Sequence, residues 1–341
     1  MRKLNSTTVN AGGKTAIVGG GTLQWEATRA LFATNKQAVK SHGLCECVLI
    51  IGPLMGGASS ILQARHDYAL DKMLASCSTM ALLSLHLPPT TPGLFCALRG
   101  AGHNFGIVSI VHLTWCITAS SPVFGILILR VRPIAYTIAY EGPESGATVY
   151  AAPFQALDPT VTQAATNVDY VALYTVSQNS FDSAACRRNL NTAYDIFAEL
   201  TADSRFSTSV LLENYCMQGV EAVGPASTAL SLEEHQFPIV ANPIIWWEGN
   251  STRATADAYA YGESIRQALF AGAPTINKHA YANYAIGAES THGYEGRRVS
   301  KLKALKKAYG PKNKFGFYKP MPVAWKPTTM GKGKAKEAYP L

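Results

Sequence analysis

The chain has 341 residues, of which 48% are hydrophobic and 15% charged, and its mean hydropathy is +0.04. This composition supports a large buried core and excludes a disordered or fibrous protein. The net charge of +8 is unevenly placed, because 13 of the 30 Lys and Arg residues but only one acidic residue lie in 297–341. No zinc-finger spacing or RNA-binding signature accompanies this basic end, so we expect no nucleic-acid partner.

Membrane and metal-binding classes are also disfavoured. The two longest uncharged runs, 73–98 and 104–129, are interrupted by prolines or polar residues, so we expect neither a membrane-spanning helix nor a membrane partner. The seven cysteines are odd in number and define no disulfide framework. Cys45 and Cys47 have no second Cys or His pair at zinc-ligand spacing downstream, so we expect no metal.

The first part of the chain reads as apolar strands that end in glycine turns. Residues 15–19 predict a strand that enters the turn Gly19–Gly21, and apolar spacing predicts a helix over 24–38. Residues 47–51 then predict a second strand before another glycine turn. Further strands are predicted at 108–117 and 124–131, which are apolar and rich in β-branched residues.

The middle of the chain contains segments with helical spacing and segments typical of strands. Helical spacing is found at 189–200 and 252–270, the second with Asn250 or Ser251 as its cap. Strands are expected at 169–176 and 206–215. This mixture predicts an α+β fold whose sheets carry helices on one face. A basic helix is expected to end at Tyr309-Gly310-Pro311.

Several nucleotide and hydrolase motifs fail on spacing. Gly13-Lys14-Thr15 is not a phosphate-binding loop, because Thr8 stands where that motif requires glycine. The segment 100–106 begins GxG, but its third glycine is one residue late and a strand follows, which disfavours a dinucleotide-binding turn. Neither GxSxG nor HExxH occurs in the chain, so hydrolase functions lose support.

Four groups of residues form a more specific set. Residues 43–48 read GLCECV and lead to GPLMGG at 52–57, residues 98–108 read LRGAGHNFGIV, residues 281–284 read YANY, and residues 309–321 read YGPKNKFGFYKPM. In this order they resemble FAD-linked oxidases of the berberine bridge enzyme-like family, especially the fungal members.

The resemblance implies a split FAD-binding domain of the PCMH type with an inserted α/β sandwich-like substrate domain, within the α+β class. Residues 1–130 would form the FAD-binding part, and 131–275 the substrate domain. Residues 276–325 would return to the FAD-binding domain, and 326–341 would be a flexible basic tail.

The implied cofactor is FAD. The first cysteine of the family's GxC turn can form a thioether to flavin C6, and Cys45 holds that position; a small buried hydrophobe is the structural alternative. The other positions that match cofactor contacts are Val48, Gly52, Gly56, Gly57, Gly106, Ile107, Val108, Asn283 and Asn313.

The implied reaction transfers hydride from an alcohol, sugar or amine carbon of a small-molecule substrate to flavin N5, with reoxidation by molecular oxygen. Tyr284 is the candidate catalytic base and Tyr281 the reserve. A tyrosine with its ordinary pKa of about 10 can take this role only if neighbouring charge or hydrogen bonds lower the pKa. Simple packing of the Tyr-x-x-Tyr pair is the alternative.

The chain departs from the family pattern in three places. The family's first lobe, whose glycine turn carries the flavin-linking histidine, lies upstream of Met1, which implies an N-terminally truncated member. Ala58, Ser59 and Ser60 replace further glycines of the glycine-rich loop, and their side chains are expected to crowd the cofactor. A run at 75–93 that contains prolines replaces two strands of the family pattern and is expected to pair poorly. When this run is back-translated, the adjacent reading frame encodes family-like sequence, which indicates a local frameshift.

Two other functions stay open at this point. A truncated chain that binds no flavin would be a non-catalytic relic or a binding module. A polyanion-binding protein would instead use the basic tail at 326–341, and its binding would be sensitive to salt.

Overall fold

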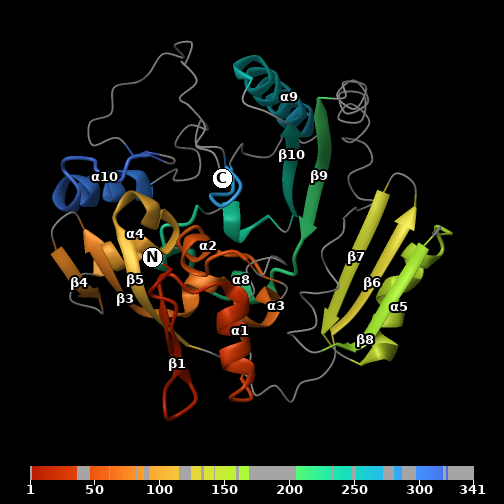
Figure 1. Cartoon of the computed structure of the whole chain (residues 1–341), viewed down its shortest axis with the longest axis horizontal. Helices are drawn as coiled ribbons and strands as arrows, with labels where there is room; N and C mark the ends of the chain where they lie inside the picture. The colour runs from red at the N-terminus through yellow and green to blue at the C-terminus, as the bar shows by residue number, and fades with distance from the viewer. Residues whose placement is uncertain are drawn as a thin grey trace. The chain divides into compact units, whose positions relative to one another are not determined.

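The computed structural model (Figure 1) divides the chain into two compact units. The first comprises Met1–Asp182, Glu213–Val240 and His279–Met321, and the second comprises Ser183–Leu212, Ala241–Lys278 and Pro322–Leu341. The structure describes residues 2–36, 47–60, 62–80, 83–87, 92–114, 124–131, 134–141, 143–158, 161–168, 205–231, 233–237, 239–247, 251–271, 280–285, 297–317 and 320–321.

A five-stranded antiparallel sheet organises the first unit. Its strands, in spatial order, are β1 (Thr7–Val9), β2 (Thr15–Gly19), β5 (Ile107–Thr114), β3 (Met73–Met80) and β4 (Leu83–Leu87). The central strand β5 is apolar and largely β-branched, which suits a strand with neighbours on both edges. In β2, Ala16 and Val18 alternate into the core, as the two-residue period of a strand requires.

Apart from α5 (Glu144–Gln155), which accompanies a second sheet, the described helices of this unit are short except for α1, α4 and α10. They are α1 (Gln24–Phe32), α2 (Ile51–Met55), α3 (Gln63–His66), η1 (Ala69–Lys72), α4 (Pro92–Ala101), η2 (Gly102–Asn104), α8 (Gln218–Glu221), η4 (Pro225–Ser227), η5 (Glu233–His235) and α10 (Arg297–Tyr309). The predicted strand at 15–19 and the end of the basic helix at Tyr309 are confirmed, whereas α1 ends at Phe32, earlier than expected.

Residues 47–51 do not form the predicted strand. They make one isolated bridge, Leu49 to Leu23, and the chain then enters α2. Backbone hydrogen bonds from Gln24 N to Val48 O (2.9 Å) and from Ile50 N to Thr22 O (3.1 Å) satisfy this short stretch locally. A short apolar run is compatible with a buried helix as well as with a strand. Here the residues that follow β2 supply the backbone hydrogen-bond partners of 48–50.

The run at 75–93 pairs well, contrary to expectation. Strands β3 and β4 form an antiparallel hairpin in which Ser76 faces Leu87 and Met80 faces Leu83. Strand β4 ends at Leu87, and Pro92 occupies the first position of α4, where a missing backbone N–H costs nothing; residues 88–91 lie outside the described residues. The predicted strands at 108–117 and 124–131 are confirmed over 107–114 and 124–131.

The core of the first unit joins the sheet to α1, α2, α4 and α10. Its fully or almost fully buried side chains include Val18, Leu31, Leu54, Leu98, Val111 and Leu302. Burial of an aliphatic side chain of this size stabilises the fold by about 1.5–3 kcal/mol, so this cluster is the main support of the unit.

Buried Lys306 connects α10 to η2. Its Nζ donates hydrogen bonds to the backbone oxygens of Asn104 and Phe315, the second at 3.0 Å. Burial lowers the pKa of this lysine. Asn104 also accepts a hydrogen bond from Met321 N through its side chain (2.8 Å), so the end of the described chain lies against the same turn.

A second sheet in this unit consists of β7 (Ile134–Glu141), β6 (Phe124–Val131) and β8 (Val161–Val168), in that order and antiparallel. Helix α5 (Glu144–Gln155) packs on it through Ala151 and Phe154, which meet Ile138.

The second unit contains α9 (Thr252–Ala271) and most of the two-stranded sheet of β9 (Phe206–Asn214) and β10 (Ile239–Trp247). Ala254, Ala258 and Ile265 on α9 pack with Phe206, as the helical spacing predicted. Ser251 Oγ accepts a hydrogen bond from Ala254 N (3.3 Å), which identifies Ser251 as the cap.

The predicted helix at 189–200 and strand at 169–176 lie outside the described residues, and the strand at 206–215 is confirmed as β9. The domain boundaries expected from the resemblance stay a prediction. Within the described part of the chain, no helix combines the length and apolar character needed to cross a membrane.

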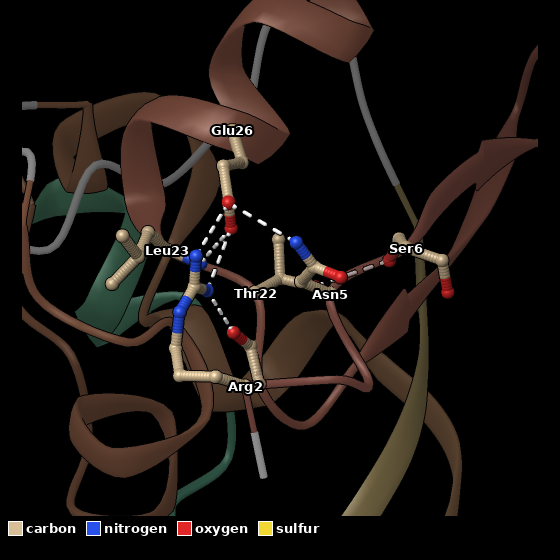
Figure 2. A network of polar contacts seen from close by, with 7 residues as sticks. Arg2, Asn5, Ser6, Thr22, Leu23 and Glu26 are labelled. Atoms are coloured by element: carbon tan, nitrogen blue, oxygen red, sulfur yellow. Dashed lines mark hydrogen bonds and ion pairs between the residues drawn. The ribbon is translucent and has the colours of Figure 1, made fainter.

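A polar network fixes the N-terminal segment over the start of α1 (Figure 2). The Glu26 carboxylate receives two hydrogen bonds from the Arg2 guanidinium (2.6 and 2.9 Å), one from Leu23 N (2.7 Å) and one from Asn5 Nδ2 (3.3 Å). These contacts, with Arg2 foremost, lower the pKa of Glu26 to about 2. The carboxylate also satisfies a free N–H at the positive end of α1.

Replacement of Glu26 by alanine is expected to lower the free energy of unfolding by about 1–2 kcal/mol at neutral pH, because a cap and a partly exposed ion pair are lost. The folded-state pKa is below the ordinary value, so this stability is present above about pH 4.5 and declines as the pH falls toward 2. Denaturant titrations of the wild type and Glu26→Ala across this range measure it. The control Glu221→Ala, at an exposed position on α8, should change little.

Candidate functional site

The glycine-rich loop and the YANY segment meet in the first unit. Asn283 Nδ2 donates hydrogen bonds to Pro53 O (3.0 Å) and to Tyr281 Oη (2.9 Å), which joins α2 to the turn at 281–285. A β-carbon built on Gly56 would lie 2.0 Å from Asn283 Oδ1. Glycine at this position is therefore required for the contact, and two predicted site residues lie against each other.

Tyr281 is buried and connects the turn at 281–285 to Ser59, which follows the glycine-rich loop. Its Oη accepts a hydrogen bond from Ser59 N (3.0 Å) and lies 3.3 Å from Ser59 Oγ. Burial raises the pKa of Tyr281 to about 12, although the hydrogen bonds from Ser59 oppose the shift. The side chain of Ser59 thus faces the protein interior, where Tyr281 contacts it.

Tyr284 packs edge-on against Tyr281, with ring centroids 5.3 Å apart and an angle of 89° between the rings. Its Oη donates a hydrogen bond of 2.5 Å to Glu213 Oε2. Burial, and then the charge of Glu213, raise the pKa of Tyr284 above its ordinary value. The condition set from the sequence, a lowered tyrosine pKa, is therefore not met, and Tyr284 is a neutral phenol at physiological pH.

Glu213 was not identified from the sequence. It lies near the end of β9, is 6% exposed, and accepts a second hydrogen bond from Tyr215 Oη at 3.0 Å. Burial raises the pKa of Glu213, while the hydrogen bonds from Tyr284 and Tyr215 act in the opposite direction. A single acidic residue at the end of the apolar strand SVLLENY was the available signal.

A segment from later in the chain packs against the glycine turn at 100–106. Ala229 N donates a hydrogen bond to Arg99 O (2.7 Å), and a β-carbon on Gly100, where φ is +116°, would lie 2.6 Å from Leu230 N. The side chain of Leu230 also lies against Gly57, at 3.3 Å from the position of a built β-carbon. Gly57 and Gly100 therefore make room for this chain's own residues.

The remaining predicted cofactor positions divide into open and closed ones. A β-carbon on Gly52 would meet no atom within 4 Å, Ile107 is 48% exposed, and Gly106 beside it is partly buried. Val48 is partly buried and Val108 belongs to the core. Gly52 and Ile107 thus leave backbone or apolar surface uncovered, and their role in cofactor binding stays a prediction.

Two predicted positions stand apart from this cluster. Asn313 is exposed, has φ of +46°, and its side chain lies against Gly316. Cys45 lies outside the described residues. Where the chain is described, no three His, Cys, Asp or Glu side chains are grouped as metal ligands.

Comparison with known proteins gives relatives but no family assignment by profile, since no protein-family model matches the chain. FAD-linked oxidoreductase chry5 of Gibberella zeae is 27% identical over 385 aligned residues, which cover 94% of this chain and 75% of that protein. FAD-linked oxidoreductase chyH of Penicillium rubens is 27% identical over 395 residues, with coverage of 94% and 76%.

Solved structures share the fold. The berberine bridge enzyme-like protein 1 of Physcomitrella patens has a TM-score of 0.75 at 17% identity, covering 96% of this chain and 81% of that one. Chitooligosaccharide oxidase has a TM-score of 0.73 at 19% identity, with coverage of 92% and 79%. A glucooligosaccharide oxidase of Acremonium strictum, described with 6-S-cysteinyl, 8α-N1-histidyl FAD, has a TM-score of 0.66 at 14% identity, with coverage of 92% and 79%. The resemblance to berberine bridge enzyme-like oxidases of the PCMH type and the α+β fold class are confirmed.

Tyr281→Phe is expected to lower the free energy of unfolding by about 1–3 kcal/mol, because the buried N–H groups of Ser59 and Asn283 lose their common acceptor. Urea denaturation of the variant and the wild type gives the difference. The control Tyr259→Phe removes a phenol that is 45% exposed on α9, and we expect it to stay within about 0.5 kcal/mol of the wild type. Equal effects in both variants would contradict the role assigned to Tyr281.

Proposed function

We propose that the protein is an FAD-dependent oxidoreductase that oxidises an alcohol, sugar or amine carbon of a small molecule and is reoxidised by molecular oxygen. The observation that carries this proposal is the hydrogen-bonded group beside the glycine-rich loop, in which Tyr281 and Glu213 are buried and Asn283 and Tyr284 partly buried. It occurs in a chain whose relatives are named FAD-linked oxidoreductases. Such a group can hold and move a proton, which this reaction requires.

FAD, when bound, would accept the hydride at its N5 atom and return the electrons to oxygen. The exposed positions Gly52 and Ile107, with the partly buried Val48 and Gly106, would hold it, and Cys45 would form the thioether. A cysteinyl bond to FAD is described for the Acremonium strictum oxidase, which supports this role for Cys45. Gly56 and Gly57 would act indirectly, by letting Asn283 and Leu230 approach the loop.

The proton route runs through two residues. As the substrate O–H or N–H loses its proton to Tyr284 Oη, the phenol proton of Tyr284 passes to Glu213 Oε2 along the 2.5 Å hydrogen bond. Tyr284 then never has to exist as a free phenolate, which its raised pKa disfavours. Glu213 must be ionised at the start, and the raised pKa of a carboxylate makes it a better proton acceptor.

A second candidate is a binding module without flavin. The contact of Leu230 with Gly57 and Gly100 supports it, because the chain's own residues fill space beside two predicted cofactor turns. The two candidates differ in one property, the ability to retain or take up FAD.

The full chain, purified and supplied with FAD, is expected to show flavin absorption that stays with the protein after acid precipitation. Cys45→Ala should release this flavin on precipitation, because the thioether is lost, while the neighbouring control Cys47→Ala should retain it. Visible spectra of pellet and supernatant measure both. Colourless protein that takes up no FAD would support the binding module in place of the oxidoreductase.

Tyr284→Phe and Glu213→Gln are each expected to slow flavin reduction on the order of 10²- to 10⁴-fold while FAD stays bound, because the proton loses its acceptor. The measurement is anaerobic flavin bleaching with oligosaccharides, simple alcohols and amines, classes that include the substrates named for the structural neighbours. In the wild type the rate should fall as acid protonates Glu213, at a pH above 4.5 because its pKa is raised. Tyr259→Phe serves as the control, and unchanged bleaching in both variants would exclude this proton route.

A further inference from the structure

The Glu213 carboxylate has one phenol partner on each oxygen. Tyr284 Oη donates to Oε2 at 2.5 Å and Tyr215 Oη donates to Oε1 at 3.0 Å. Glu213 is 6% exposed, so water cannot replace either donor freely. The two hydrogen bonds have different roles. The proposed proton route passes through Oε2 and Tyr284, and it does not involve Tyr215.

The strand fixes this arrangement locally. Glu213 is the second-last residue of β9, and Tyr215 directly follows the last strand residue, Asn214. Asn214 is exposed, so Glu213 and Tyr215 lie on the same side of the chain. The titratable groups that face Glu213 are Tyr215 and Tyr284, and Tyr281 is near both phenols. Among the described residues no Lys, Arg or His side chain pairs with this carboxylate.

A buried carboxylate without a cation depends on its hydrogen-bond donors to stay ionised. A single donor would also leave the carboxylate free to rotate and to present either oxygen. Two donors on opposite oxygens remove both problems. The raised pKa of Tyr215, caused first by burial and then by the charge of Glu213, keeps this phenol protonated and therefore a constant donor.

We propose that Tyr215 is a positioning residue for the reaction: its O–H holds Glu213 Oε1, keeps the carboxylate ionised, and aims Oε2 at Tyr284. This inference rests on the proposed function. When the Tyr284 proton reaches Oε2, Tyr215 remains a donor to Oε1, so no proton leaves Tyr215 and no further acceptor is needed. Tyr215 thus sets the pH at which the site begins to work.

The first experiment measures the Glu213 carboxyl directly and needs no flavin. Infrared spectra of the full chain are recorded against pH, with Glu213→Gln as the blank that assigns the band. Tyr215→Phe is expected to raise the pKa of this carboxyl by about one unit, because a hydrogen bond to the charged form is lost. Tyr259→Phe should leave it unchanged. An unchanged pKa in Tyr215→Phe, or equal shifts in the two variants, would overturn the proposal.

A second variant protects the test if Tyr215→Phe does not fold. Site-specific incorporation of 3-fluorotyrosine at position 215 makes the phenol a stronger donor with almost no change of volume. The Glu213 pKa is then expected to fall, opposite to the effect of phenylalanine. A rise or no change would overturn the proposal.

The kinetic experiment separates this inference from the proposed function. If the wild type reduces no bound flavin with any substrate tested, the proposed function fails, and the wild type alone reveals that failure. In an active protein, Tyr215→Phe should move the acid limb of kcat/KM upward by the same shift as the carboxyl. A carboxyl shift with a stationary acid limb would refute the role of Tyr215 and leave the oxidoreductase function intact.

Discussion

A buried carboxylate needs hydrogen-bond donors, and the candidate site depends on the hydrogen bonds that two phenols donate to Glu213. These hydrogen bonds bring the end of β9 to the turn at 281–285, which in turn contacts α2 through Asn283. Segments that are far apart in the sequence are joined because each buried polar group needs a partner. The proposed proton route uses one of these hydrogen bonds, from Tyr284 to Glu213.

The glycines of the site act through the space that they leave. A β-carbon on Gly56 would clash with the Asn283 side chain that reaches Pro53, and a β-carbon on Gly100 would clash with the backbone of Leu230. Gly100 also has a positive φ that other residues rarely adopt. These positions hold protein segments together, whereas Gly52 leaves open space. Glycine-rich turns that look alike in sequence therefore have two different roles.

The polar cluster and the open cofactor positions have different physical needs. Proton transfer needs buried groups at short, fixed distances, as in the contact between Tyr284 and Glu213. A flat cofactor needs accessible backbone and apolar surface, which is why the proposed FAD site uses Gly52 and Ile107. Both occur in the first unit. Buried Lys306, near the C-terminal end of the chain, also stabilises this unit, because its hydrogen bonds connect α10 and Phe315 to η2.

The sequence alone determined the α+β class, the strands at 15–19 and 124–131, the helix at 252–270 and the family resemblance, because each depends on patterns of residues that are close together in the chain. It left Asn250 and Ser251 as alternative caps of that helix, and the structure selected Ser251. The sequence also identified Tyr281, Asn283 and Tyr284 as a group. The tertiary structure decided that 47–51 is not a strand, that 75–87 forms a hairpin, and that Glu213 is the partner of Tyr284. That hydrogen bond spans 71 positions and depends on how β9 packs against the turn, so no local pattern could have specified it.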